Sequence, residues 1–310
     1  MTTDTELITN AISQKNQGNY DGAEKFYNEA IALNGTSLHK AYYNKGVLLE
    51  ILNRLEEAQD CYTKATSLKP DYGIAWNNLG DLLCRRHSYE RAKVVFEKAL
   101  TLMPNEFNPR IGLAYALNRL NDFNSSLNIL KKLLEESTVQ NLDNKSRSKI
   151  YSEMGLALMH TNNITMAQQH FTKAFELYGQ DYQTCYNIAF IADVEKKYDV
   201  AIEFYDKAIA LNPNEAKGHQ GKACTLVHIG KYEEALDLIK KAIQLDSNNF
   251  EGYYNLACIY ANLAKEKEMF DALEKTIDLA PPQINIGHHI LNDPDFSNYR
   301  RKISLMINGE

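Results

Sequence analysis

A period of 34 residues runs through the chain and constrains its fold more than any other feature. Units with the same pattern of small, aromatic and proline positions begin at residues 4, 39, 73, 107, 148, 182, 216 and 250. Self-similarity at a fixed spacing is typical of repeat architectures, in which each unit buries its apolar face by stacking on its neighbours. The period therefore predicts a solenoid of about eight units.

The clearest unit runs from Gly73 to Pro104. It follows the pattern W-x2-L-G, then A-x3-F and P, with Trp76, Leu79, Gly80, Tyr89, Ala92, Phe96, Ala99 and Pro104. On these residues the chain resembles the tetratricopeptide repeat family. The resemblance implies an all-α fold: a right-handed α-α superhelical solenoid of about eight helix hairpins with a C-terminal capping helix. The closing stretch from Tyr253 to Tyr299 is similar to that of many bacterial members, which implies a bacterial source.

Small residues in the first helix of each unit predict close packing of helix pairs. Gly46, Gly80 and Gly155, or alanine in the other units, let neighbouring helices approach, and proline ends several second helices. The turn inside a hairpin calls for residues that tolerate a left-handed backbone. Those residues are Gly18, Asn53, Asn121, Asn162 and Gly230.

One interruption divides the repeat. The fourth unit is degenerate, and a polar stretch from Ser137 to Ser148 lengthens the step to the next unit, which predicts an extended loop or a flexible joint. We therefore expect N-terminal units over 1–138, a joint over 139–147, further units over 148–283 and a cap over 284–310. In that cap, Phe296, Tyr299, Ile303 and Met306 form the apolar stripe of one last helix.

Composition narrows the classes of function. A net charge of −6, with dispersed basic residues, argues against nucleic acid as the main ligand. The N-terminus lacks the features of a secretory signal, and no apolar run is long enough to span a membrane. Five single, widely spaced cysteines argue against a disulfide framework. We expect a cytoplasmic protein without a membrane segment.

Catalytic and cofactor motifs are missing from the sequence. The densest group of metal-binding residue types is His288, His289, Asp293 and Asp295. A metal site would need three or four ligands to converge with an ordered outer shell, and a loop leading into the cap helix explains these residues equally. We expect no enzyme activity, no metal and no cofactor.

The candidate binding residues follow from the resemblance. In the family, first helices line the concave surface, and an asparagine in the first helix can hold a peptide backbone. An amide can donate and accept at once. That slot holds Asn44, Asn78, Asn187 and Asn255, interrupted by Gly112, Glu153 and Gly221. Aromatic and charged neighbours on the same face are Tyr43, Tyr186, Tyr254, Tyr115, Phe190, Lys40, Arg85 and Arg119.

These residues predict a scaffold that binds a protein or peptide partner, as an extended peptide or a helix, in the concave groove. The same aromatic residues could also serve only to pack neighbouring repeats. The alternative function is self-association through terminal units or the convex face, which would give a homo-oligomeric assembly platform.

Overall fold

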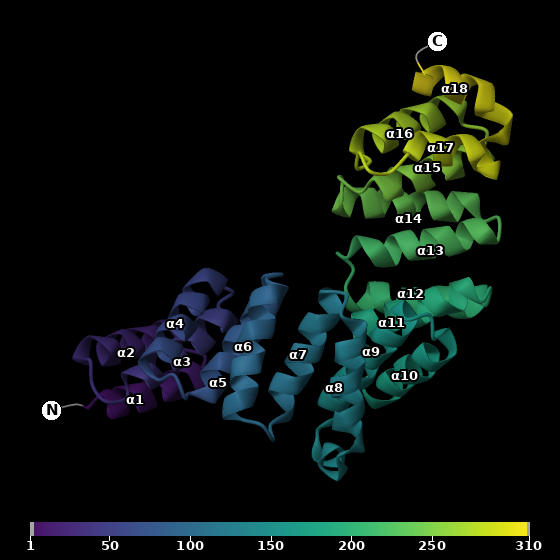
Figure 1. Ribbon diagram of the computed structural model, residues 1–310. Coiled ribbons are helices and arrows are strands. Elements are labelled where there is room, and N and C mark those ends of the chain that lie inside the picture. Colours follow the sequence, from purple (N-terminus) through teal and green to yellow (C-terminus); the bar gives the residue numbers. More distant parts are fainter. Residues whose placement is uncertain (1–2, 309–310) are drawn as a thin grey trace. The chain divides into compact units, whose positions relative to one another are not determined.

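The computed structural model describes residues 3–308, and the regular secondary structure within them consists of helices alone (Figure 1). Eight pairs of helices follow one another along the chain, as the period predicts. The first helices of the pairs are α1 Asp4–Asn16, α3 Leu38–Ile51, α5 Gly73–Arg85, α7 Phe107–Arg119, α9 Asn144–His160, α11 Tyr182–Val194, α13 Ala216–His228 and α15 Phe250–Asn262. The second helices are α2 Tyr20–Leu33, α4 Leu55–Leu68, α6 Tyr89–Leu102, α8 Phe123–Glu135, α10 Ile164–Leu177, α12 Tyr198–Leu211, α14 Tyr232–Leu245 and α16 Glu266–Leu279.

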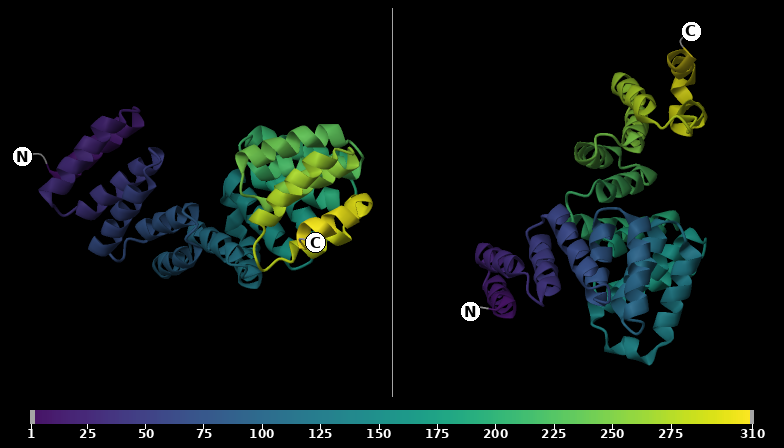
Figure 2. Two further views of the ribbon diagram at one scale, coloured as in Figure 1. Left: turned by 90° about the horizontal axis from the view of Figure 1, so that it is seen from above. Right: turned by 60° about the vertical axis from the view of Figure 1, so that its left-hand side comes forward.

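The chain divides into two compact units, Met1–Ala167 and Gln168–Glu310. Within each unit the hairpins stack in chain order (Figure 2). First helices of successive hairpins contact each other, for example α5 with α7 and α13 with α15, while α2, α4, α6, α8, α12 and α14 each pack against the first helix that follows. The first helices therefore form a continuous layer within each unit, and this layer carries the predicted binding residues.

Left-handed residues make the turns inside the hairpins. All five predicted positions have positive φ, including Gly18 at 79° and Asn121 at 62°. The equivalent turns of other pairs place His87, Lys196 and Ala264 at φ between 56° and 61°. The turn therefore imposes this conformation even on residues that do not favour it.

Aromatic rings explain the small residues of the first helices. A Cβ added at Gly46 would lie 2.7 Å from the ring of Tyr62, and one at Gly80 would lie 2.6 Å from the ring of Phe96. Both rings are fully buried between their helices. Glycine is therefore required at these positions for the two helices of a pair to close on the ring.

The stretch between the fourth and fifth pairs is partly ordered as a 3-10 helix, η1 Ser137–Asn141, before α9 begins. Val139 is buried and Leu142 half-buried in a cluster with Ile111, Leu130 and Ile150 of the flanking helices. These contacts hold the stretch against unit 1. The division of the repeats at 139–147 stays a prediction.

The cap is built differently from the single helix predicted. It consists of α17 Ile286–Asn292, a 3-10 helix η2 Pro294–Tyr299, and α18 Arg300–Asn308. Asp293 starts η2 by accepting from the backbone of Asp295, and Pro294 follows at its first position, so a continuous α-helix is interrupted there. The predicted apolar stripe is nevertheless right: Phe296 and Ile303 are fully buried against α15 and α16.

Candidate partner-binding surface

The predicted asparagines of unit 1 and the predicted Tyr43 lie on α3 and α5. The Asn78 amide donates to the Tyr43 hydroxyl at 3.3 Å and so links two neighbouring first helices. Tyr43 packs edge-on against Tyr72 at 5.4 Å. Asn44 donates at 2.8 Å to the backbone carbonyl of Lys40 in its own helix. Lys40 is exposed, and both amides remain partly accessible.

Two cations lie over the Tyr115 ring in the next hairpins. Arg119 is 4.5 Å and Lys149 5.5 Å from the ring centroid. Burial opposes the charge of Arg119, but Glu153 and Tyr115 outweigh burial and raise its pKa. This group is a charged, half-buried patch in which each cation already has aromatic or acidic neighbours.

Glu50 and Asp81 provide the acidic part of the same layer. Arg85 forms an ion pair with Glu50 at 2.9 Å. Asp81 accepts from the Asn77 amide at 3.2 Å but has no cation within ion-pair distance in the described chain. Burial raises the pKa of Asp81 to about 6, while Lys149 opposes this rise and Glu50 adds to it.

In unit 2 the predicted residues of α11 differ in accessibility. Asn187 is only 2% exposed; its carbonyl accepts from Gln183 at 3.0 Å, and its amide nitrogen is buried without a partner among the described atoms. Tyr186 packs against Tyr205 at 5.8 Å. Phe190, one turn after Tyr186, is 40% exposed. Phe190 is therefore directly accessible to a partner, whereas Asn187 requires a local rearrangement.

The pair Tyr254 and Asn255 on α15 lies between two pockets. The Tyr254 hydroxyl donates to the carboxylate of Asp293 in the cap, and the Asn255 amide contacts the sulfur of Cys224 at 3.3 Å. One pocket of about 340 Å³ and another of about 350 Å³ are both lined by Tyr254 and Asn255. This is the place in unit 2 where predicted binding residues face concave surface.

The gaps in the asparagine series have a packing cause. A Cβ at Gly112 would overlap the ring of Phe96, and one at Gly221 would overlap the ring of Tyr205. Rings of the preceding hairpins thus occupy the space that an asparagine would need. The third gap holds Glu153, which accepts from the Asn118 amide at 2.8 Å. The sequence shows the gaps, but the long-range ring contacts become visible only in the structure.

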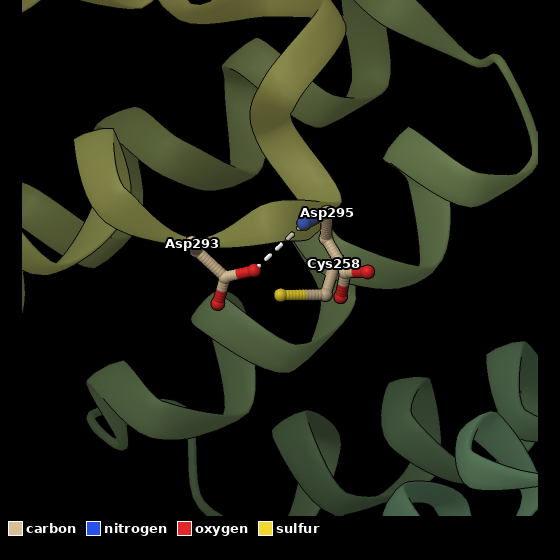
Figure 3. A group of neighbouring side chains, drawn as sticks. All are labelled: Cys258, Asp293 and Asp295. Carbon is tan, nitrogen blue, oxygen red and sulfur yellow. Dashed lines mark hydrogen bonds between the residues drawn. The ribbon is translucent and has the colours of Figure 1, made fainter.

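Cys258 joins two of the acidic residues singled out in the sequence. Its sulfur and the carboxylates of Asp293 and Asp295 offer atoms that all lie within 4.8 Å of one another (Figure 3). The histidines lie elsewhere: His288 and His289 belong to α17, not to a loop. Both oxygens of Asp293 already accept hydrogen bonds, one from Tyr254 and one from the Asp295 backbone at 2.8 Å. Burial and then the two aspartates raise the pKa of Cys258, which keeps the thiol protonated.

Comparison with protein families gives matches to tetratricopeptide repeat models at both ends of the chain. The matched residues are 11–37, 39–72, 182–215, 204–237, 225–263 and 250–283. Together these segments cover more than half of the chain.

Curated relatives match over parts of their length. The chain is 24% identical over 208 residues to human protein O-mannosyl-transferase TMTC3, covering 67% of this chain and 22% of that protein. It is 25% identical to TPR repeat-containing protein MJ1428 of Methanocaldococcus jannaschii, covering 66% and 42%. It is 29% identical to the peroxisomal targeting signal receptor of Candida albicans, covering 33% and 17%. The chain thus spans less than half the length of each of these relatives.

Solved structures share the fold at low sequence identity. The APC/C hetero-tetramer Cut9-Hcn1 superposes with a TM-score of 0.67 at 17% identity, covering 82% of this chain and 48% of that chain. A tetratricopeptide repeat protein from Parabacteroides merdae gives 0.65 at 16%, covering 82% and 97%. The human IFIT1 dimer with m7Gppp-AAAA gives a TM-score of 0.60 at 17% identity, covering 97% of this chain and 74% of that chain.

Within residues 3–308, the helices are too short or too polar to cross a membrane.

Proposed function

We propose that this chain, which belongs to the tetratricopeptide repeat family, is a scaffold. It binds a segment of a partner protein along the first helices of its hairpins. The segment lies as an extended peptide or a helix, with its contacts made by aromatic rings and amides of these helices. The length of the layer provides many modest contacts, and a few pockets provide specificity.

The observation that carries this proposal is the position of Tyr254 and Asn255 between two pockets. A partly accessible amide beside a tyrosine offers two hydrogen bonds to a peptide unit and an aromatic surface to the neighbouring side chain. Asn78 with Tyr43 repeats this combination in unit 1. The accessible ring of Phe190 adds an apolar contact in unit 2.

The chemistry of the thiols supports recognition in preference to catalysis. Burial raises the pKa of Cys61 and Cys185 to about 11 and that of Cys84 and Cys224 to about 12, and it also raises the pKa of Cys258. A nucleophilic cysteine needs the opposite shift. The transferase activity in the names of the TMTC relatives belongs to much longer proteins, of which this chain covers 22% of human TMTC3 and 11% of human TMTC1.

The test is selection of short random peptides displayed on phage against the immobilised chain, followed by affinity measurement of the selected peptides. We expect binding to the wild-type chain and weaker binding to Asn255→Ala. Loss of hydrogen bonds from one amide costs about 1–3 kcal/mol, which corresponds to roughly 5-fold to 150-fold in affinity.

Asn248→Ala is the matched control, because Asn248 is exposed in the loop before α15 and does not line either pocket. It should bind the selected peptides like the wild type. Equal binding by all three chains would place the contact outside the Tyr254 and Asn255 surface. Failure to select any peptide, together with a mass that rises with protein concentration in sedimentation, would favour self-association.

A further inference from the structure

The pocket of about 350 Å³ beside Asn255 has an apolar side and an acidic side. Val227 of α13 and Tyr254 of α15 contribute the apolar side, and the fully buried Ile259 lies next to it. Asp293 and Asp295, at the start of η2, contribute the acidic side. The cap thus brings two carboxylates to the edge of the layer of first helices.

The charges around this pocket are unbalanced. Its lining residues include two aspartates and one histidine but neither lysine nor arginine. The histidine, His228, lies 3.2 Å from Asp193, a further acidic neighbour. Glu251 lines the adjoining pocket. Burial, followed by Asp193 and Glu251, raises the pKa of Cys224 to about 12, which is consistent with a negative potential at this surface.

The shape fits a long side chain better than a bare ion. Cys258 is only 7% exposed, and both oxygens of Asp293 are occupied by hydrogen bonds that position the cap. A carboxylate oxygen has a second lone pair, so Asp293 can still accept from a ligand donor. The pocket volume and the apolar side exceed what an ion needs, but they match an aliphatic stem that ends in a cation.

We propose that this pocket receives an arginine or lysine side chain of the bound partner segment, with the aliphatic stem against Val227 and Tyr254 and the cationic head at Asp293 and Asp295. Arginine fits best, because its planar group offers five donors to the two carboxylates. This inference rests on the proposed function and adds the chemical class that the pocket selects.

The pocket can be tested without knowing the partner. The probe is n-butylguanidinium, and the readout is the methyl signals of Val227 and Ile259 in the labelled full chain by nuclear magnetic resonance. We expect saturable shifts of these signals with n-butylguanidinium. The affinity for n-butylurea, which has a similar shape but no charge, should be at least tenfold weaker. The affinity should fall as salt is raised, because the attraction is electrostatic.

Substitutions identify the carboxylates. Asp293→Asn combined with Asp295→Asn should weaken n-butylguanidinium at least tenfold, while asparagine retains the ability to cap η2. Asp246→Asn is the control, since it makes the same type of exchange and removes one negative charge from an exposed position at the end of α14. If the double variant does not fold, the comparison of the guanidinium and urea probes on the wild-type chain still shows whether the pocket selects a positive charge.

Three outcomes of the probe experiments would overturn the inference. One is equal binding of the charged and neutral probes, and another is equal loss of binding in the Asp246→Asn control. The third is saturation by micromolar zinc with exclusion of n-butylguanidinium, which would make the group around Cys258 a metal site. Peptides that bind at Asn255 without enrichment of basic residues would reject this inference and leave the proposed function intact. Absence of any peptide binding would reject the proposed function.

Discussion

Some residues in the hairpin turns adopt a left-handed backbone conformation that lowers the free energy of unfolding. Lys196 and Ala264 have φ of 61° and 56°, where a side chain with a Cβ is disfavoured by roughly 1–2 kcal/mol per residue. We expect Ala264→Gly and Lys196→Gly each to raise the free energy of unfolding by about 0.5–1 kcal/mol, measured by urea denaturation. Gly230→Ala, at φ of 75°, should lower it by a similar amount. This explanation would be contradicted if the exchanges to glycine and the exchange Gly230→Ala changed the free energy of unfolding in the same direction.

The sequence predicts those turn positions that hold glycine or asparagine, because their backbone preferences match the turn. It does not reveal His87, Lys196 and Ala264, since their conformation is imposed by the helices on either side. The binding surface shows the same division. The asparagine slots follow from the period, but the burial of Asn187 depends on contacts that the period does not encode.

Asp81 makes stability depend on pH. Its folded-state pKa of about 6 lies above the ordinary value of 3.8, so the folded chain holds this proton more tightly than the unfolded chain. The contribution of Asp81 to stability therefore falls as pH rises from about 4 to about 6 and stays low above that range. We expect Asp81→Asn to stabilise the chain by about 1–3 kcal/mol near pH 8 and by little near pH 4, measured by denaturation at both pH values. If the difference in stability between Asp81→Asn and the wild type were the same at both pH values, it would be inconsistent with a raised pKa of Asp81.

At the scale of elements, the cap depends on few side chains. Phe296 is fully buried and packs on Tyr254 at 6.0 Å between ring centroids. Phe296→Ala should lower the free energy of unfolding of unit 2 by about 3–5 kcal/mol, because it leaves a cavity where three helical elements meet. Leu305→Ala is the control within the cap: this side chain is 49% exposed, so its removal should cost less than about 0.5 kcal/mol. Similar losses for both variants would mean that the cap does not pack on α15.

The elements also show where periodicity stops predicting. Apolar spacing correctly identifies the buried face of the cap, but Asp293 and Pro294 replace the predicted helix by a 3-10 turn followed by α18. Asp293 and Asp295 lie 35 or more residues after Cys258 in the chain. The sequence places Asp293 and Asp295 in one group, but only the packing of η2 on α15 brings them to Cys258 and the pocket.

For the whole molecule, contacts are short in range along the chain. Within each unit, helices pack against the next one or two helices along the chain, as expected when repeats interact only with their nearest neighbours. A local loss of stability should then affect the nearest hairpins and fade with distance along the repeats. A solenoid of this kind need not unfold in one step.

The single tryptophan provides a test of that expectation. Trp76 lies in α5 of unit 1, and its indole N–H donates to the Pro70 carbonyl at 3.0 Å, so its fluorescence reports on unit 1 alone, whereas circular dichroism reports on all helices. We expect Phe296→Ala to lower the denaturation midpoint by circular dichroism and to leave the fluorescence midpoint unchanged. Gly80→Ala, which presses a methyl group against Phe96 beside Trp76, should lower the fluorescence midpoint. If both variants move both midpoints equally, the repeats unfold as one cooperative block, and the nearest-neighbour description of this chain is wrong.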